Sequence, residues 1–115
     1  MDHAERRQAL EAKGAQVICL PNATGKVDLA AMLKDLGTKH INEVHVEAGH
    51  KLNGSLLREG LVDELLTYLA PKLMGQGRGM TNLGPFTSLN DAKALTFHEV
   101  TQIGPDLRIL ARLAR

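Results

Sequence analysis

The stretch that decides the fold is Val44–Leu57, VHVEAGHKLNGSLL, in which an apolar strand pattern runs through a turn of small residues directly into a helix pattern. A helix that starts at the carboxyl end of a strand points unpaired N–H groups and the positive end of its dipole into the crevice where α/β proteins bind ligands. A phosphate group fits that position. Gly49 would let a ligand approach the main chain, whereas Gly54 inside the helix costs about 1 kcal/mol relative to alanine and needs a compensating reason.

Spacing alone leaves two interpretations of this segment open. In the first, Lys51 adds a cation and Ser55 a hydroxyl donor, so the first helical turns bind a pyrophosphate or a 2′-phosphate. Glu47 would repel such a phosphate and is better suited to accept hydrogen bonds from ligand hydroxyls. In the second interpretation the glycines only permit a tight turn and close packing. The pattern matches neither the dinucleotide fingerprint nor the P-loop, so it does not decide between the two.

Upstream of this segment the sequence predicts alternating helices and strands. We expect a helix at Ala4–Lys13 that stops at Gly14, and a buried strand at Ala15–Leu20. An amphipathic helix should follow an Asp28 N-cap and end near Gly37. The pattern Ile41, Val44, Val46 then predicts the strand that leads into the helix His50–Glu59, which ends at Gly60.

Downstream, the apolar run Leu61–Ala70 predicts a central strand covered on both faces, with Asp63 and Glu64 at its entrance. The glycine-rich stretch Leu73–Asn90 predicts a long loop. Leu95–Ile103 and Leu107–Leu113 predict an antiparallel hairpin around Gly104-Pro105-Asp106. The whole order predicts one α/β domain with a mixed sheet, parallel through the crossovers and antiparallel at its C-terminal edge.

Composition excludes several classes of function. The 115 residues carry 14 Lys and Arg against 13 Asp and Glu, a net charge of +1, so we expect no nucleic-acid partner. No apolar run approaches the roughly 18 residues of a membrane span, and the charged start is unlike a secretory signal, so we expect no membrane association. The single cysteine fits a reducing compartment, and the cytoplasm is the expected location.

Other chemically active side chains are interpreted as structural. No metal is expected, because His3-Ala4-Glu5 lacks a partner Cys-x-x-Cys motif, and His40, His45 and His98 lack spaced ligands. Gly75-Gln76-Gly77-Arg78-Gly79 is interpreted as a flexible loop, since no helix follows it, and Arg78 as a weak candidate for a phosphate contact. Cys19 is interpreted as a small core residue.

Four segments together resemble the C-terminal reductase half of the bacterial bifunctional riboflavin-biosynthesis deaminase/reductase family. They are Val46–Gly49 with Leu52 and Gly54, Gly60–Leu65, Tyr68–Gly75, and Ile103–Asp106. The resemblance spans nearly the whole chain. It implies a dihydrofolate-reductase-like mixed sheet flanked by helices, of which residues 1–115 would be the C-terminal part, with no deaminase domain.

The resemblance also implies an activity, namely the NADPH-dependent reduction of 5-amino-6-(5-phosphoribosylamino)uracil to its ribitylamino product. Glu47 would then contact the substrate, a phosphorylated aminopyrimidine. The cofactor would be bound by the run Gly49, His50, Lys51, Leu52, Asn53, Gly54 and Ser55. His50 and Lys51 depart from the family pattern, which often has a small residue or proline and then threonine, so a charged contact would replace a hydroxyl contact. No side chain is identified as a catalytic proton donor.

Two alternatives stay open. The chain could be a catalytically incomplete structural or dimerisation fragment, whose partners in the full-length protein are the N-terminal remainder of the reductase and the deaminase domain. A folate-type reductase is the more remote alternative. Because a partial domain exposes sheet edges, we expect a homo-oligomer that pairs through the C-terminal hairpin.

Overall fold

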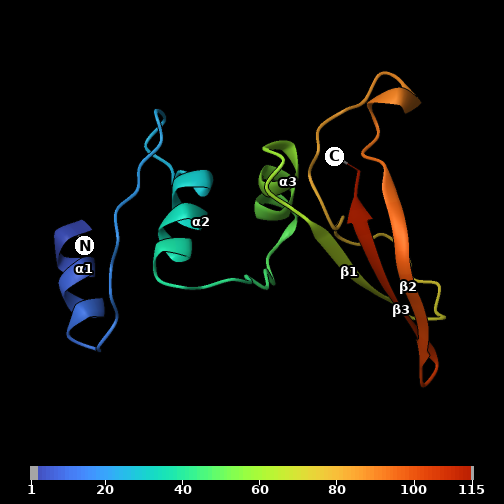
Figure 1. The fold of residues 1–115 in the computed structure, drawn as a ribbon, viewed down its shortest axis with the longest axis horizontal. Coiled ribbons are helices and arrows are strands. Elements are labelled where there is room, and N and C mark those ends of the chain that lie inside the picture. Colours follow the sequence, from blue (N-terminus) through green and yellow to red (C-terminus); the bar gives the residue numbers. More distant parts are fainter. Residues whose placement is uncertain (1–2, 115) are drawn as a thin grey trace. The chain divides into compact units, whose positions relative to one another are not determined.

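The computed structural model describes residues 3–114 (Figure 1), which divide into two compact units between Val44 and His45. The first unit contains the helices α1 (His3–Glu11) and α2 (Leu29–Thr38). The second contains helix α3 (His50–Arg58), strand β1 (Glu64–Leu69), the short 3-10 helix η1 (Leu89–Asp91), and strands β2 (Leu95–Ile103) and β3 (Asp106–Leu113). The helices that the sequence predicts are therefore confirmed, with ends shifted by one or two residues.

In the first unit, local side-chain contacts explain where the helices begin and end. The Asp28 carboxylate accepts a hydrogen bond from the Ala31 backbone N–H at 2.8 Å, which confirms it as the N-cap of α2. Gly14 has φ +85° just after α1, a conformation that favours glycine. At the end of α2, the residue with positive φ is His40 at +62°, whereas Gly37 lies inside the helix.

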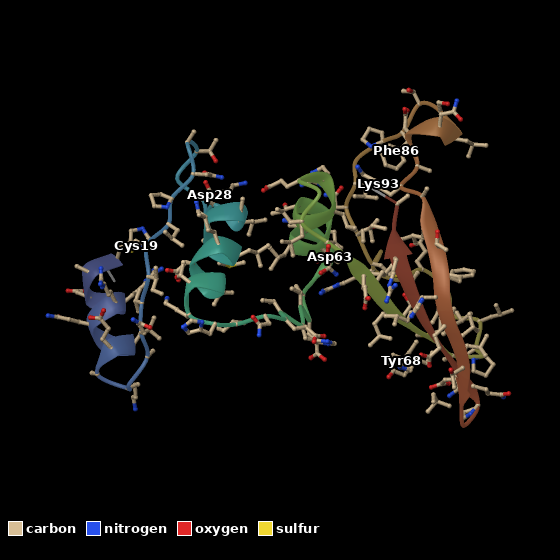
Figure 2. All side chains as sticks on the ribbon, in the orientation of Figure 1. Cys19, Asp28, Asp63, Tyr68, Phe86 and Lys93 are labelled. Atoms are coloured by element: carbon tan, nitrogen blue, oxygen red, sulfur yellow. The ribbon has the colours of Figure 1, made fainter. Side chains whose placement is uncertain are left out.

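The two strands predicted in the N-terminal half are wrong for the residues that the structure describes. Neither Ala15–Leu20 nor Ile41–Val46 forms a strand, and the only pairing outside the named strands within residues 3–114 is the isolated bridge Pro21↔Val27. A parallel strand needs neighbours on its edges to satisfy its backbone groups, and no described segment pairs with these two. Cys19, on the first of these segments (Figure 2), is exposed, so its interpretation as a core residue is also wrong.

In the second unit, the three strands form an antiparallel sheet in the order β1-β3-β2. The hairpin β2–β3 is confirmed, with Gly104 at φ +58° in its turn. The central strand is β3, so the prediction that Leu61–Ala70 is central and covered on both faces is wrong: β1 is an edge strand, and Tyr68 is 58% exposed. An apolar run shows that a strand forms but does not show how many neighbours it has.

The buried apolar residues of this unit lie on α3 and on β3. Leu56 and Leu57 of α3 and Ala111 of β3 are buried, and Ala111 lies opposite Leu65 on one side and Phe97 on the other. Two arginines of β3 pair with carboxylates of the flanking strands: Arg112 with Glu64 at 3.1 Å and Arg108 with Glu99 at 3.0 Å. Because side chains alternate along a strand, both ion pairs lie on the face of the sheet opposite Ala111, together with Leu110.

Candidate functional site

The second unit contains a cavity of about 410 Å³ at the N-terminal end of α3. Three segments line it: the turn before α3 with the start of that helix, strand β1, and the loop that follows β1. The lining residues are Ala48, Gly49, His50, Asn53, Leu65, Leu66, Thr67, Tyr68, Arg78, Gly79, Met80 and Thr81. Tyr68 is labelled on β1 in Figure 2. The volume lies within the range of roughly 300–1,000 Å³ that is typical of small-molecule sites.

The N-terminal end of α3 borders the cavity without a side-chain cap. Gly49 is the N-cap residue, and no side chain caps the helix there. The first N–H groups of a helix have no acceptor within it, so this end can donate to an anion. Gly49 has φ −77°, an ordinary extended conformation, and a Cβ there would meet nothing within 4 Å. Neither backbone strain nor internal packing therefore explains this glycine, whereas close approach of a ligand would.

Asn53 links the turn before α3 to the loop that follows β1. Its Nδ2 amide donates to the Ala48 carbonyl at 3.1 Å and to the Met80 carbonyl at 3.0 Å. The backbone N–H of Asn82 also donates to the His50 carbonyl at 2.9 Å. The start of α3 and the loop after β1 are thus tied together by hydrogen bonds from both sides.

Gly54 explains why this loop can lie so close to the helix. A Cβ on Gly54 would come within 2.7 Å of the carbonyl carbon and 2.8 Å of the backbone nitrogen of Asn82. Arg58, one turn further along α3, donates to the Asn82 carbonyl. The compensating reason for a glycine inside this helix is therefore close packing against the backbone of residue 82.

The residues singled out from the sequence are divided by the structure. Gly49, His50 and Asn53 line the cavity, whereas Lys51, Leu52, Gly54 and Ser55 do not. The Ser55 hydroxyl donates to the Lys51 carbonyl at 3.1 Å and accepts from Arg58 at 3.1 Å. The Glu47 carboxylate is 87% exposed and lies 3.4 Å from His45 Nε2, outside the lining.

Two groups of lining residues were not assigned to the site from the sequence. Leu65–Tyr68 belong to β1, which the sequence describes only as a strand. Arg78–Thr81 belong to the loop that was interpreted as flexible, with Arg78 as a weak candidate. The signal for the loop was its run of glycines with one arginine, but nothing in the spacing shows that it folds back onto α3.

The charge of the cavity is unbalanced. No Asp or Glu is among its lining residues, and Arg78 is the lining side chain with a permanent charge. Hydroxyl groups of Thr67, Tyr68 and Thr81 add hydrogen-bond donors. The lining therefore combines an apolar surface from β1 with donors that suit an anionic group.

Neither metal ligands nor membrane spans are found elsewhere in the described part of the chain. Within residues 3–114, no three His, Cys, Asp or Glu side chains gather as a potential metal site. No helix among those residues is long and apolar enough to cross a membrane.

Comparison with known proteins identifies one consistent set of relatives. The RibD C-terminal domain family matches residues 2–109. Riboflavin biosynthesis protein RibD of Escherichia coli (strain K12) is 42% identical over 93 residues, which are 80% of this chain and 25% of that protein. A protein of Buchnera aphidicola subsp. Acyrthosiphon pisum named 5-amino-6-(5-phosphoribosylamino)uracil reductase is 36% identical over 86 residues, 74% of this chain and 42% of that protein.

A solved structure supports the same grouping. Acinetobacter baumannii RibD superposes with a TM-score of 0.82 and 30% identity, covering 95% of this chain and 29% of that one. The α/β, dihydrofolate-reductase-like fold class that the resemblance implies is thereby confirmed. The chain spans about a quarter of the length of the RibD proteins it matches.

Proposed function

Because the chain belongs to the RibD C-terminal domain family, we propose that it is part of an NADPH-dependent reductase domain of riboflavin biosynthesis. The proposed reaction reduces the ribosylamino group of 5-amino-6-(5-phosphoribosylamino)uracil to a ribitylamino group. The name of the Buchnera relative supports this substrate. In this reaction NADPH would supply a hydride to the sugar carbon, and solvent would supply the proton that completes the reduction.

The single observation that carries the proposal is the cavity at the start of α3. Its donor set fits a dinucleotide: an uncapped helix N-terminus and Arg78 suit phosphate, and no lining carboxylate opposes it. The apolar side chains of β1 suit the flat face of a ring. We therefore assign the lining part of the run from Gly49 to Ser55 to direct cofactor contact.

The remaining residues of that run have a different proposed task. Gly54 admits the loop at Asn82, and Ser55 with Arg58 holds that contact from the helix side. Lys51 and Leu52 present their backbone N–H groups at the start of the helix. These residues contribute to the shape of the site, while the protein's part in catalysis is to align the cofactor with the sugar and exclude water.

Glu47 is proposed as the substrate contact. It lies two residues before the N-cap of α3 and is exposed, so its carboxylate is available to ligand hydroxyls near the cavity mouth. Among the described residues 3–114 its ion-pair partner is His45, whose Nε2 lies 3.4 Å from the carboxylate. A carboxylate at that position would accept hydrogen bonds from a ribityl or ribosyl group.

The direct test is calorimetric titration of the purified chain with NADPH and with NADH at low ionic strength. Saturable binding that prefers NADPH is expected. Circular dichroism on the same sample shows whether the chain is folded. A folded chain that binds neither nucleotide would contradict the assignment of the cavity as a cofactor site.

A second candidate function is a catalytically incomplete structural or dimerisation part of the reductase. It is favoured by the exposure of apolar side chains on β2, where Phe97 is 69% and Val100 53% exposed. Such a face needs a partner, either a second copy of the chain or the rest of a full-length protein. We propose a homo-oligomer and a cytoplasmic location on the same grounds as from the sequence; a chain that binds no nucleotide but self-associates would favour this second candidate.

A further inference from the structure

We propose that Arg78 binds a phosphate group of the dinucleotide, so that the loop after β1 determines cofactor affinity together with α3. This inference rests on the proposed function, because it names a further residue of the same site. The sequence pattern gave this task to Lys51. The geometry points instead to a side chain that lies 27 residues further along the chain.

Arg78 differs from the other three described arginines of the second unit, whose side chains are all paired within the protein. Arg58 donates to the Asn82 carbonyl, Arg108 pairs with Glu99, and Arg112 pairs with Glu64. Arg78 makes neither a side-chain hydrogen bond nor an ion pair within the described residues 3–114. Its guanidinium is available for an anion, and it is the one of these four that lines the cavity.

The second support is the electrostatic character of the cavity. The positive end of the α3 dipole lies at Gly49 and His50, and Arg78 lines the same cavity from a different segment. No carboxylate is among the lining residues, so no internal partner competes with a phosphate for either group. A guanidinium can also form two parallel hydrogen bonds to phosphate oxygens.

The third support is that the loop near Arg78 has a defined position. Met80, two residues after Arg78, has its carbonyl held by the Asn53 amide at 3.0 Å. The N–H of Asn82 is held by the His50 carbonyl at 2.9 Å. Besides lining the cavity, Asn53 therefore also positions the loop that carries Arg78.

Lys51 is less well placed for the same contact. It is exposed and does not line the cavity, although it belongs to the first turn of α3. Arg78 is exposed as well, so the two cations differ in that Arg78 lines the cavity and carries a planar guanidinium that can pair with two phosphate oxygens. Arg78→Ala is therefore expected to weaken binding more than Lys51→Ala does.

The experiment is calorimetric titration of the folded chain and its variants with NADPH, with NADH, and with ribose 5-phosphate as a probe for the phosphoribosyl group of the proposed substrate. Arg78→Ala should weaken dinucleotide binding about tenfold, the order expected for a charge-assisted hydrogen bond, and Arg78→Lys should restore part of the affinity. Lys72→Ala removes a cation from the same loop outside the cavity and should leave binding unchanged. Melting curves of all variants control for folding.

Each outcome decides the inference. A larger loss for NADPH than for NADH assigns Arg78 to the 2′-phosphate, and an equal loss assigns it to the pyrophosphate; both support the proposal. If Arg78→Ala binds both nucleotides as tightly as the wild type, or weakens only ribose 5-phosphate, the proposal is overturned while the cofactor site stands. If the folded wild-type chain binds neither nucleotide, the proposed cofactor site is refuted, and the role of Arg78 is refuted with it.

Discussion

Substituting Gly54 by alanine should destabilise the protein, although alanine is the better helix former. In an unobstructed helix this change stabilises by up to about 1 kcal/mol. At position 54 the new Cβ would lie 2.7 and 2.8 Å from backbone atoms of Asn82, and a backbone cannot rotate away as a side chain can. Overpacking of this kind costs about 1–3 kcal/mol, so the expected net loss is about 1–2 kcal/mol.

Gly37 provides the matched control for this change. It also lies inside a helix, α2, but a Cβ there meets nothing within 4 Å. Gly37→Ala should therefore stabilise by about 0.5–1 kcal/mol. The two variants make the same chemical change in the same kind of element, and the prediction is that their effects have opposite signs.

Thermal unfolding followed by circular dichroism measures both. For a unit of this size, 1 kcal/mol shifts Tm by about 4–8 °C, so Gly54→Ala should lower Tm by roughly 5–15 °C and Gly37→Ala should raise it by a few degrees. The loop at residues 80–82 must also shift in Gly54→Ala, so NADPH affinity should fall. A Gly54→Ala variant that melts at or above the wild-type temperature would refute the packing argument for α3 and the loop.

Three further predictions follow from individual contacts. Asn53→Ala removes the amide that donates to the Ala48 and Met80 carbonyls and should destabilise the loop by about 1–2 kcal/mol, measured as faster hydrogen exchange of the Asn82 backbone amide. Unchanged exchange would show that the Asn53 side chain does not hold the loop. Asp28→Ala removes the cap of α2 and should cost about 1 kcal/mol by denaturant titration, with Asp28→Asn close to wild type; equal losses would mean that the carboxylate charge, not the cap, stabilises the helix. Phe97→Lys places a charge on the exposed apolar face of β2 and should shift sedimentation profiles toward the monomer; a wild-type chain that is monomeric at high concentration would remove that expectation.

The departures from sequence-based expectation have a common physical origin. Helix ends were predictable because local chemistry fixes them, as at Asp28, where a carboxylate caps a backbone N–H three residues away. The strands at Ala15–Leu20 and Ile41–Val46 were not, because a strand depends on a neighbour distant in sequence, and none of the described residues supplies one. The position of β1 at the edge of its sheet depends in the same way on its pairing with β3, a strand distant in sequence.

The candidate site shows the same division. The turn at Gly49 and the start of α3 could be found from the sequence, because strand, small residues and helix follow one another along the chain. The roles of Asn53 and Gly54 could not, since their partners, the Met80 carbonyl and the Asn82 backbone, lie almost thirty residues away. The interpretation of the residue 75–79 run as merely flexible missed that its end lines the cavity.

The sequence by itself determined the family, the helices, the C-terminal hairpin and the anion-suited turn before α3, because each of these is encoded by neighbouring residues. Only the tertiary structure decided which strand is central, why residue 54 is glycine, and which cation borders the cavity. These three features depend on contacts between segments that are distant in sequence, such as those that form when the loop after β1 folds back onto α3.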